Sequence, residues 1–116
     1  MKEIKAILQP ETLDATIHAL QAIPGLPGMT VSHVEGFGKI HHGAAGAAGE
    51  DAHHALHPFD ERAKLEVVIP DRLLEPVLQA IRSTAHVGRP GAGKVFVYDV
   101  SDVLNLRTGE RGEKAI

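Results

Sequence analysis

The sequence predicts an α+β fold in which two helices cover one side of a four-stranded antiparallel sheet. Apolar residues at alternate positions, the pattern typical of strands, occur in four segments of the 116-residue chain. Apolar residues three or four positions apart, the pattern of amphipathic helices, follow the first and the third of these segments. This order, strand-helix-strand-strand-helix-strand, is that of a ferredoxin-like sandwich. The length allows one domain, residues 1–116.

The first half of the chain supplies two strands and a helix. Residues 2–8 alternate and predict the first strand. Pro10 suits the start of a helix, because its fixed φ and missing N–H are tolerated in the first turn. The glycines and prolines of 24–28 end this helix, and 29–38 predict the second strand. The helix buries one stripe, formed by Leu13, Ile17 and Leu20.

The second half repeats the pattern after a long irregular segment, 39–62. Residues 63–69 alternate as a third strand, and Asp71 is the expected N-cap of the second helix. Pro76 removes a backbone N–H, so this helix is expected to start late or kinked. The last strand is expected over 94–100, then a short extended piece, 104–107, and a polar tail within 101–116. The second helix buries Leu74, Val77, Leu78, Ile81 and Ala85.

The fourth strand carries apolar side chains on both faces. In 95–98 the order is Val-Phe-Val-Tyr, whereas two helices can cover only one face of the sheet. The other face therefore predicts an oligomer. The alternative is a single strand with a few exposed apolar residues.

Composition excludes several classes of function. Net charge is −3, which leaves no basic surface for nucleic acid, and the three Phe and one Tyr offer few stacking platforms. No apolar run reaches the length of about 18 residues that spans a membrane, so we expect membrane contact only through a partner protein. Without cysteine there are no disulfides or thiolate ligands. The N-terminus lacks a secretory signal pattern, which favours the cytoplasm.

The glycine-rich turn before the fourth strand raises the question of phosphate binding. Residues 88–94 superficially match G-x-x-x-x-G-K, but Val95 replaces the Ser or Thr that would hold magnesium. The turn also precedes a strand where a nucleotide-binding P-loop precedes a helix. Backbone N–H groups of successive glycines can still converge on an anion; the alternative is an ordinary turn. The candidate cradle and its cations are Gly91, Ala92, Gly93, Arg89, Lys94 and Arg107.

Several blocks in order resemble the PII signal-transduction family over nearly the whole chain. They are 28–31 (GMTV), 36–38 (GFG), 64–71 (KLEVVIPD), 91–100 (GAGKVFVYDV) and 107–112 (RTGERG). The resemblance implies a homotrimer with ATP or ADP in clefts between subunits. It also implies that the long loop 39–62 carries the signal to a transporter or enzyme.

The resemblance assigns roles to individual residues. Thr30, Glu66 and Val68 would frame the adenine. Gly91, Ala92, Gly93 and Lys94, with Arg89 and Arg107, would surround the phosphates. Gly36, Phe37 and Gly38 would form the base of the moving loop.

Departures from the family pattern limit what is carried over. Asn105 replaces the first of two arginines, and Ala92 replaces a polar residue between the glycines. ATP binding is then expected to be weaker, or ADP or AMP preferred. Ile40 stands where a glutamine helps hold magnesium and 2-oxoglutarate, which makes 2-oxoglutarate sensing doubtful. Tyr98 is the single tyrosine and lies in a strand, so modification of a loop tyrosine is not expected.

Five histidines gather in the long loop, and imidazoles without thiols suit Zn, Ni or Cu(II). A solvated loop that binds nothing specific, or a pH-responsive one, fits the same residues. The leading prediction is a nucleotide-binding regulator. The alternative is a metal-binding or bicarbonate-responsive module in which the loop or a small anion replaces 2-oxoglutarate sensing. No base paired with a nucleophile suggests an enzyme. The candidate ligands are His41, His42, His53, His54 and His57.

Overall fold

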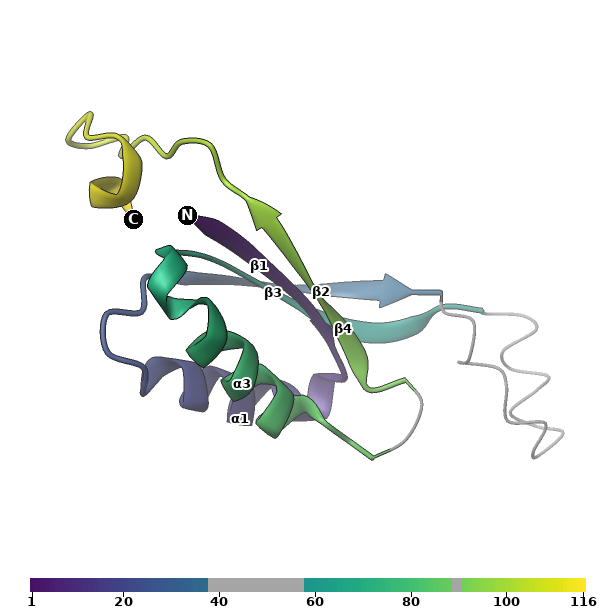
Figure 1. The fold of residues 1–116 in the computed structure, drawn as a ribbon. Coiled ribbons are helices and arrows are strands. Elements are labelled where there is room, and N and C mark those ends of the chain that lie inside the picture. Colours follow the sequence, from purple (N-terminus) through teal and green to yellow (C-terminus); the bar gives the residue numbers. More distant parts are fainter. Residues whose placement is uncertain (38–57, 89–90) are drawn as a thin grey trace, which may run out of the picture.

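The structure confirms the predicted sandwich. A computed structural model describes residues 1–37, 58–88 and 91–116, which form one four-stranded antiparallel sheet in the order β2-β3-β1-β4. Two helices lie side by side on one face of this sheet, and the described residues place no helix on the other face (Figure 1). The elements are β1 (Lys2–Leu8), α1 (Leu13–Gln21), β2 (Met29–Gly36), β3 (Asp60–Ile69), α3 (Leu74–Ala85) and β4 (Gly93–Asp99), with short 3-10 turns at Pro10–Thr12, Asp71–Leu73 and Gly112–Ala115.

The core lies between the sheet and the helices. The central strand β1 pairs Ile4 with Val67 of β3 and with Val97 of β4, so alternate residues of neighbouring strands share one face. One polar side chain, Thr16, is fully buried there, and its hydroxyl lies 2.9 Å from that of Thr84 on α3. The buried apolar residues are Ile4, Ala6, Leu8, Leu13, Leu20, Ala63, Leu65, Val67, Ile69, Leu73, Val77, Ile81 and Ala85.

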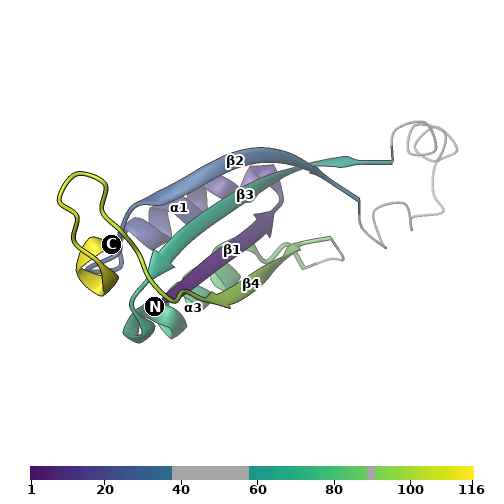
Figure 2. The same ribbon diagram turned by 90° about the horizontal axis from the view of Figure 1, so that it is seen from above.

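The opposite face of the sheet, here called the open face, is visible from above in Figure 2. It combines charged and apolar side chains. The Lys5 ammonium lies 5.8 Å from the ring centre of Phe96 and 4.9 Å from that of Tyr98. Both rings are more than 40% exposed, as expected for a strand that is apolar on both faces. In the described part of the chain no helix is long and apolar enough to cross a membrane.

Two predicted boundaries of the long loop are wrong. β3 begins at Asp60 and not at Ala63, because its pairing with β2 continues as far as Gly36 opposite Asp60. β2 correspondingly ends at Gly36 and not at residue 38. The expected loop 39–62 therefore loses its last three residues to the sheet. At the other edge β4 spans Gly93–Asp99, one residue earlier than predicted at each end.

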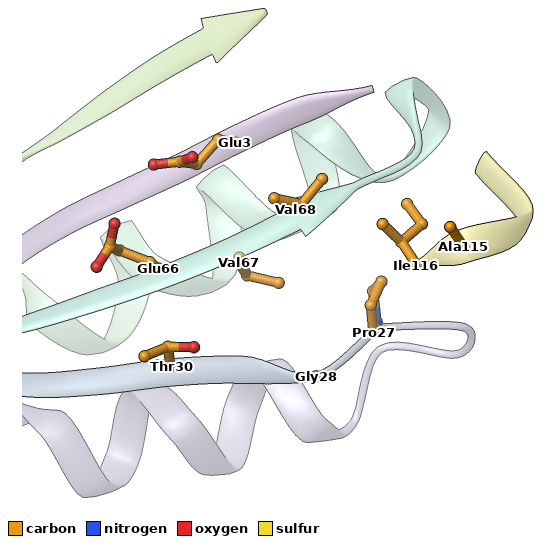
Figure 3. A pocket seen from close by; sticks show the side chains of 9 residues that line it. All are labelled: Glu3, Pro27, Gly28, Thr30, Glu66, Val67, Val68, Ala115 and Ile116. Atoms are coloured by element: carbon orange, nitrogen blue, oxygen red, sulfur yellow. The ribbon is translucent and has the colours of Figure 1, made fainter. Parts of the chain in front are cut away.

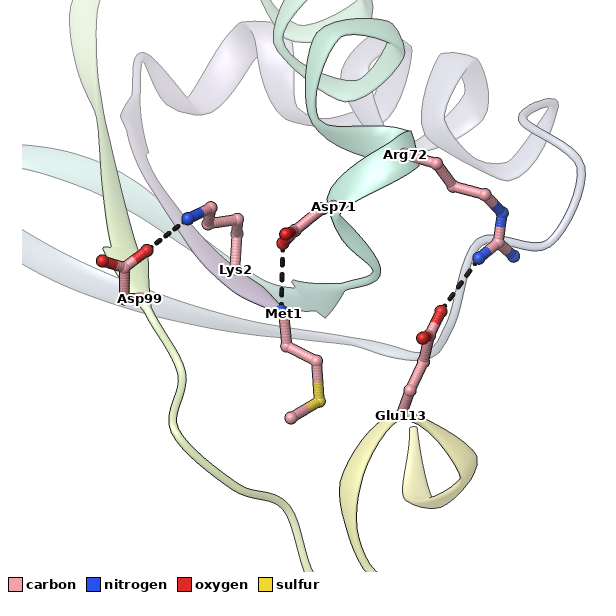
Figure 4. Close-up of polar contacts among 6 residues, drawn as sticks. All are labelled: Met1, Lys2, Asp71, Arg72, Asp99 and Glu113. Carbon is pink, nitrogen blue, oxygen red and sulfur yellow. Dashed lines mark hydrogen bonds and ion pairs between the residues drawn. The ribbon is translucent and has the colours of Figure 1, made fainter.

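The start of the second helix differs in its cap. Asp71 is not the N-cap: it is the first residue of a 3-10 turn, and no side chain caps either this turn or α3. The Asp71 carboxylate instead lies 3.0 Å from the N-terminal amine of Met1 (Figure 4). The late start was predicted correctly. α3 begins at Leu74, which places Pro76 in the first turn, where a backbone N–H has no helical partner.

The C-terminal segment is not the extended piece predicted for 104–107. Leu104 makes one isolated bridge to Arg111, and the residues between them form turns. Residues 102–112 therefore fold back on themselves as a small hairpin, here called the C-terminal hairpin.

Candidate functional site

A cavity of about 460 Å³, here called the base cavity after the residues predicted to frame a nucleotide base, opens where the open face meets the C-terminal tail (Figure 3). Thr30 and Glu66 lie directly opposite each other in the β2–β3 register, and Val68 follows on the same face of β3. The three residues predicted to frame a base therefore line one cavity, although they lie far apart in the sequence. Its lining residues are Glu3, Pro27, Gly28, Thr30, Glu66, Val67, Val68, Ala115 and Ile116.

The lining combines apolar and polar side chains. Val68, Pro27 and Ile116 supply apolar surface, while Thr30 and Glu66 place a hydroxyl and a carboxylate within the same space. Such a combination, apolar walls with a few polar groups, is typical of small-molecule sites. Among the described residues no lysine or arginine lines this cavity, so it offers no side-chain cation to a phosphate.

Sequence reasoning missed six of the nine lining residues, among them Val67 between Glu66 and Val68 in β3. Glu3 lies on the open face by strand alternation, and Pro27 and Gly28 directly precede β2. The sequence pattern could therefore have predicted that these three residues lie near the cavity. Ala115 and Ile116 carried no signal, because their place depends on how the tail folds back.

The glycine turn lies at the other edge of the sheet. Gly91 and Gly93 have φ values of +91° and +121°, which L side chains rarely adopt. The side-chain amide of Gln9 donates a hydrogen bond of 2.5 Å to the Gly91 carbonyl. Ala92, Gly93 and Lys94 line a second cavity of about 320 Å³ between β4 and α3. Arg89 lies outside the described residues.

The two predicted halves of the site are separated within one subunit. Thr30 is on β2 and Lys94 on β4, the two outer strands of the sheet. Three strand spacings separate these strands, about 14 Å. A single subunit therefore does not place the base cavity and the glycine turn side by side.

Arg107 and Asn105 lie together in the C-terminal hairpin. The Asn105 side-chain oxygen accepts hydrogen bonds from the backbone N–H of Arg107 at 2.9 Å and of Thr108 at 3.1 Å. Asn105 was interpreted from the sequence as a lost cation. In the structure it holds the backbone that presents the exposed Arg107.

A salt bridge closes this hairpin. The Asp102 carboxylate accepts hydrogen bonds from the Arg111 guanidinium (2.7 Å from Nε) and from the backbone N–H groups of Val103 and Gly112. The Arg111 guanidinium, and next the Val103 N–H, hold the pKa of Asp102 below its usual value. The hairpin is thus tied at both ends by one side chain.

The base of the long loop is partly described. Gly36 ends β2, and the ring of Phe37 lies 5.8 Å, centre to centre, from that of Phe59, which precedes β3. These aromatic rings meet across the two stems of the loop. Gly38 and the predicted metal ligands His41, His42, His53, His54 and His57 lie outside the described residues. Within the described ranges no three metal-ligating side chains gather.

Comparison with known proteins decides the family. The family model described as "Nitrogen regulatory protein P-II" matches residues 1–110. The chain belongs to the P-II family. It is 39% identical to the nitrogen regulatory protein P-II of Rhodospirillum rubrum, 40% to that of Rhizobium meliloti and 38% to the nitrogen regulatory protein P-II 1 of Escherichia coli K12. Each match covers the whole of both chains.

Membership in the P-II family confirms the resemblance drawn from the short blocks of the sequence. The family model ends at residue 110, so it leaves out the last residues of the tail that line the base cavity. The roles of individual residues in this P-II protein remain predictions.

Proposed function

We propose that this P-II protein is a regulator that binds adenine nucleotide in clefts between subunits and acts on a transporter or enzyme through its long loop. The observation that carries the proposal is the cavity that gathers Thr30, Glu66 and Val68. The base would lie against Val68, with its hydrogen-bonding edge toward Thr30 and Glu66. The phosphates would meet Gly91, Gly93 and Lys94.

The separation of these two groups supports a site shared by two subunits. A cleft in which the β4 edge of one subunit approaches the β2–β3 edge of another brings the glycine turn to the base cavity. The same association covers Phe96 and Tyr98 on the open face, whose exposure a lone subunit leaves unexplained. A homotrimer of this kind accounts for both features.

The strand geometry supports a connection from the base cavity to the loop. Thr30 and Gly36 lie in the same strand, about 20 Å apart at the usual rise per residue. Glu66 lies in β3, the other stem of the loop. A nucleotide shifts the loop only to the extent that it binds two loop states with different affinity. Binding across β2 and β3, the two strands that lead to the Phe37–Phe59 contact at the loop base, provides a physical basis for that difference.

The test is calorimetric titration of the full chain with ATP, ADP and AMP. Glu66→Gln should weaken every adenine nucleotide about tenfold or more, because a charged hydrogen-bond acceptor is replaced by a weaker, neutral amide oxygen. Glu61→Gln, the same change elsewhere in β3, is the matched control and should bind as the wild type. Lys94→Ala should weaken ATP more than AMP, since only ATP carries the distal phosphates.

Two results would overturn the proposal. Absence of binding by the wild type at millimolar nucleotide would exclude the cleft sensor. Equal behaviour of Glu66→Gln and Glu61→Gln would place the base elsewhere. Repeating the wild-type titrations with zinc and with bicarbonate identifies a second signal if either ligand changes the nucleotide affinity.

A further inference from the structure

The C-terminal turn Gly112–Ile116, here called the tail turn, forms one wall of the base cavity. Ala115 and Ile116 face the space bounded by Pro27 and Val68 (Figure 3). The opposite walls come from strands, whereas this wall is a short 3-10 turn that lies outside the sheet (Figure 1). The shape of the cavity therefore depends on where the tail turn is held.

A salt bridge attaches the tail turn to the start of the second helix. The Arg72 guanidinium lies 2.9 Å from the Glu113 carboxylate (Figure 4). Arg72 also reaches the turn that precedes β2, where a side chain added at Gly25 would lie 3.7 Å from its Nη2 atom. That turn continues into Pro27 and Gly28, which line the cavity. The Arg72 guanidinium thus lies next to two walls of the cavity, the tail turn and the turn that precedes β2.

The entry to the tail turn is fixed independently. The Gly112 N–H lies 2.9 Å from the Val103 carbonyl and 3.1 Å from an Asp102 carboxylate oxygen. The tail turn is therefore held at its first residue by the C-terminal hairpin and at Glu113 by Arg72. Leu106, in the neighbouring C-terminal hairpin, is 94% exposed and lines neither cavity. The position of Ile116 in the cavity wall is therefore not a general property of the C-terminal residues.

We propose that the tail turn is a specificity-determining wall of the base site. Ile116 packs against the bound base, and the Arg72–Glu113 pair positions it. The inference rests on the proposed function, since it assigns a role to residues around the same cavity. It predicts that the tail turn controls affinity for the base and leaves the phosphate contacts at the glycine turn, at the other edge of the sheet, unchanged.

The first test distinguishes contacts to the nucleotide base from contacts to the phosphates. ADP and inorganic tripolyphosphate are titrated into the full-length wild type, Ile116→Ala and Leu106→Ala. Loss of apolar contact in Ile116→Ala should weaken ADP about tenfold. Leu106→Ala removes an apolar side chain from the C-terminal hairpin, outside the cavity, and should leave ADP affinity unchanged. Tripolyphosphate, which has no base, should bind all three proteins alike.

The second test addresses the positioning role of Arg72. Because both partners are exposed, Arg72→Glu should weaken ADP only about two- to fivefold. The exchanged pair Arg72→Glu with Glu113→Arg should restore wild-type affinity. Lys114→Glu makes the same change of charge within the tail turn and should have no effect. Restoration by the exchanged pair is a result that a general loss of charge would not produce.

The outcomes distinguish the two proposals. If the wild type binds no adenine nucleotide, the proposed function and the tail-turn inference both fail. If the wild type binds ADP but Ile116→Ala equals Leu106→Ala, the tail-turn inference alone is wrong. It is also wrong if Ile116→Ala weakens tripolyphosphate as much as ADP.

Discussion

At the scale of single residues, Gly93 shows a position where only glycine fits. Its φ of +121° is rarely adopted by L residues, and a Cβ atom there would lie 2.0 Å from the backbone carbonyl oxygen of Ile7 in β1. A backbone atom held in the central strand cannot move aside. Gly88, in the same turn, also has a positive φ (+69°) but has open space around it.

These two glycines make a matched pair for a stability test. Gly93→Ala should lower the free energy of unfolding by about 2–4 kcal/mol, because strain and a backbone clash combine. Gly88→Ala should cost about 1–2 kcal/mol, the cost of the left-handed backbone alone. Urea denaturation of both variants measures the difference. Equal losses would contradict the close approach of Gly93 to Ile7.

At the scale of elements, the C-terminal hairpin depends on one carboxylate. Asp102 bonds to Arg111 and to two backbone N–H groups, and these contacts favour its charged form. Its pKa in the folded protein is therefore lower than in the unfolded chain. A carboxyl group of this kind stabilises the fold above its unfolded pKa of about 3.9, and that stabilisation is lost as the pH falls through the lower folded pKa.

The hairpin should accordingly loosen in acid. We expect the amide signal of Gly112 in NMR spectra to titrate with a midpoint below about pH 3.9. In Asp102→Asn this titration should disappear, and the signal should already resemble the loosened form at neutral pH. Asp14→Asn, on α1, removes an exposed acid elsewhere and should leave the titration intact. A Gly112 signal insensitive to both pH and Asp102→Asn would contradict the role of Asp102 in holding the hairpin together.

At the scale of the whole molecule, the open face is the surface that a lone subunit leaves unsatisfied. Phe96 and Tyr98 are each more than 40% exposed in β4, an outer strand of the sheet. Contact with Tyr98 raises the pKa of Lys5, so the ammonium stays charged beside the rings. Apolar rings around a paired cation suit burial against other copies of the chain.

The expected trimer can be tested by a single charge on this face. Phe96→Asp should shift the protein toward monomers in sedimentation experiments, because the new carboxylate would be buried without a partner. Gln79→Asp adds the same charge to the exposed side of α3 and should leave the assembly unchanged. A trimeric Phe96→Asp protein, or a monomeric wild type, would contradict assembly through the open face.

The sequence by itself determined the order of elements, the sides of the strands that face the core, and membership in the P-II family. These depend on periodicity and on short blocks, which reflect backbone geometry within one segment. The late start of α3 followed in the same way from Pro76. The N-cap assigned to Asp71 failed, because a 3-10 turn and the N-terminal amine compete for that position.

Tertiary structure alone decided how distant residues meet. Strand register set Thr30 opposite Glu66, and the separation of the outer strands divided the predicted site into two halves. The return of the tail brought Ile116 to the cavity and gave Asn105 the role of a backbone support. No local pattern encodes these placements, since each depends on contacts between segments that are remote in the chain.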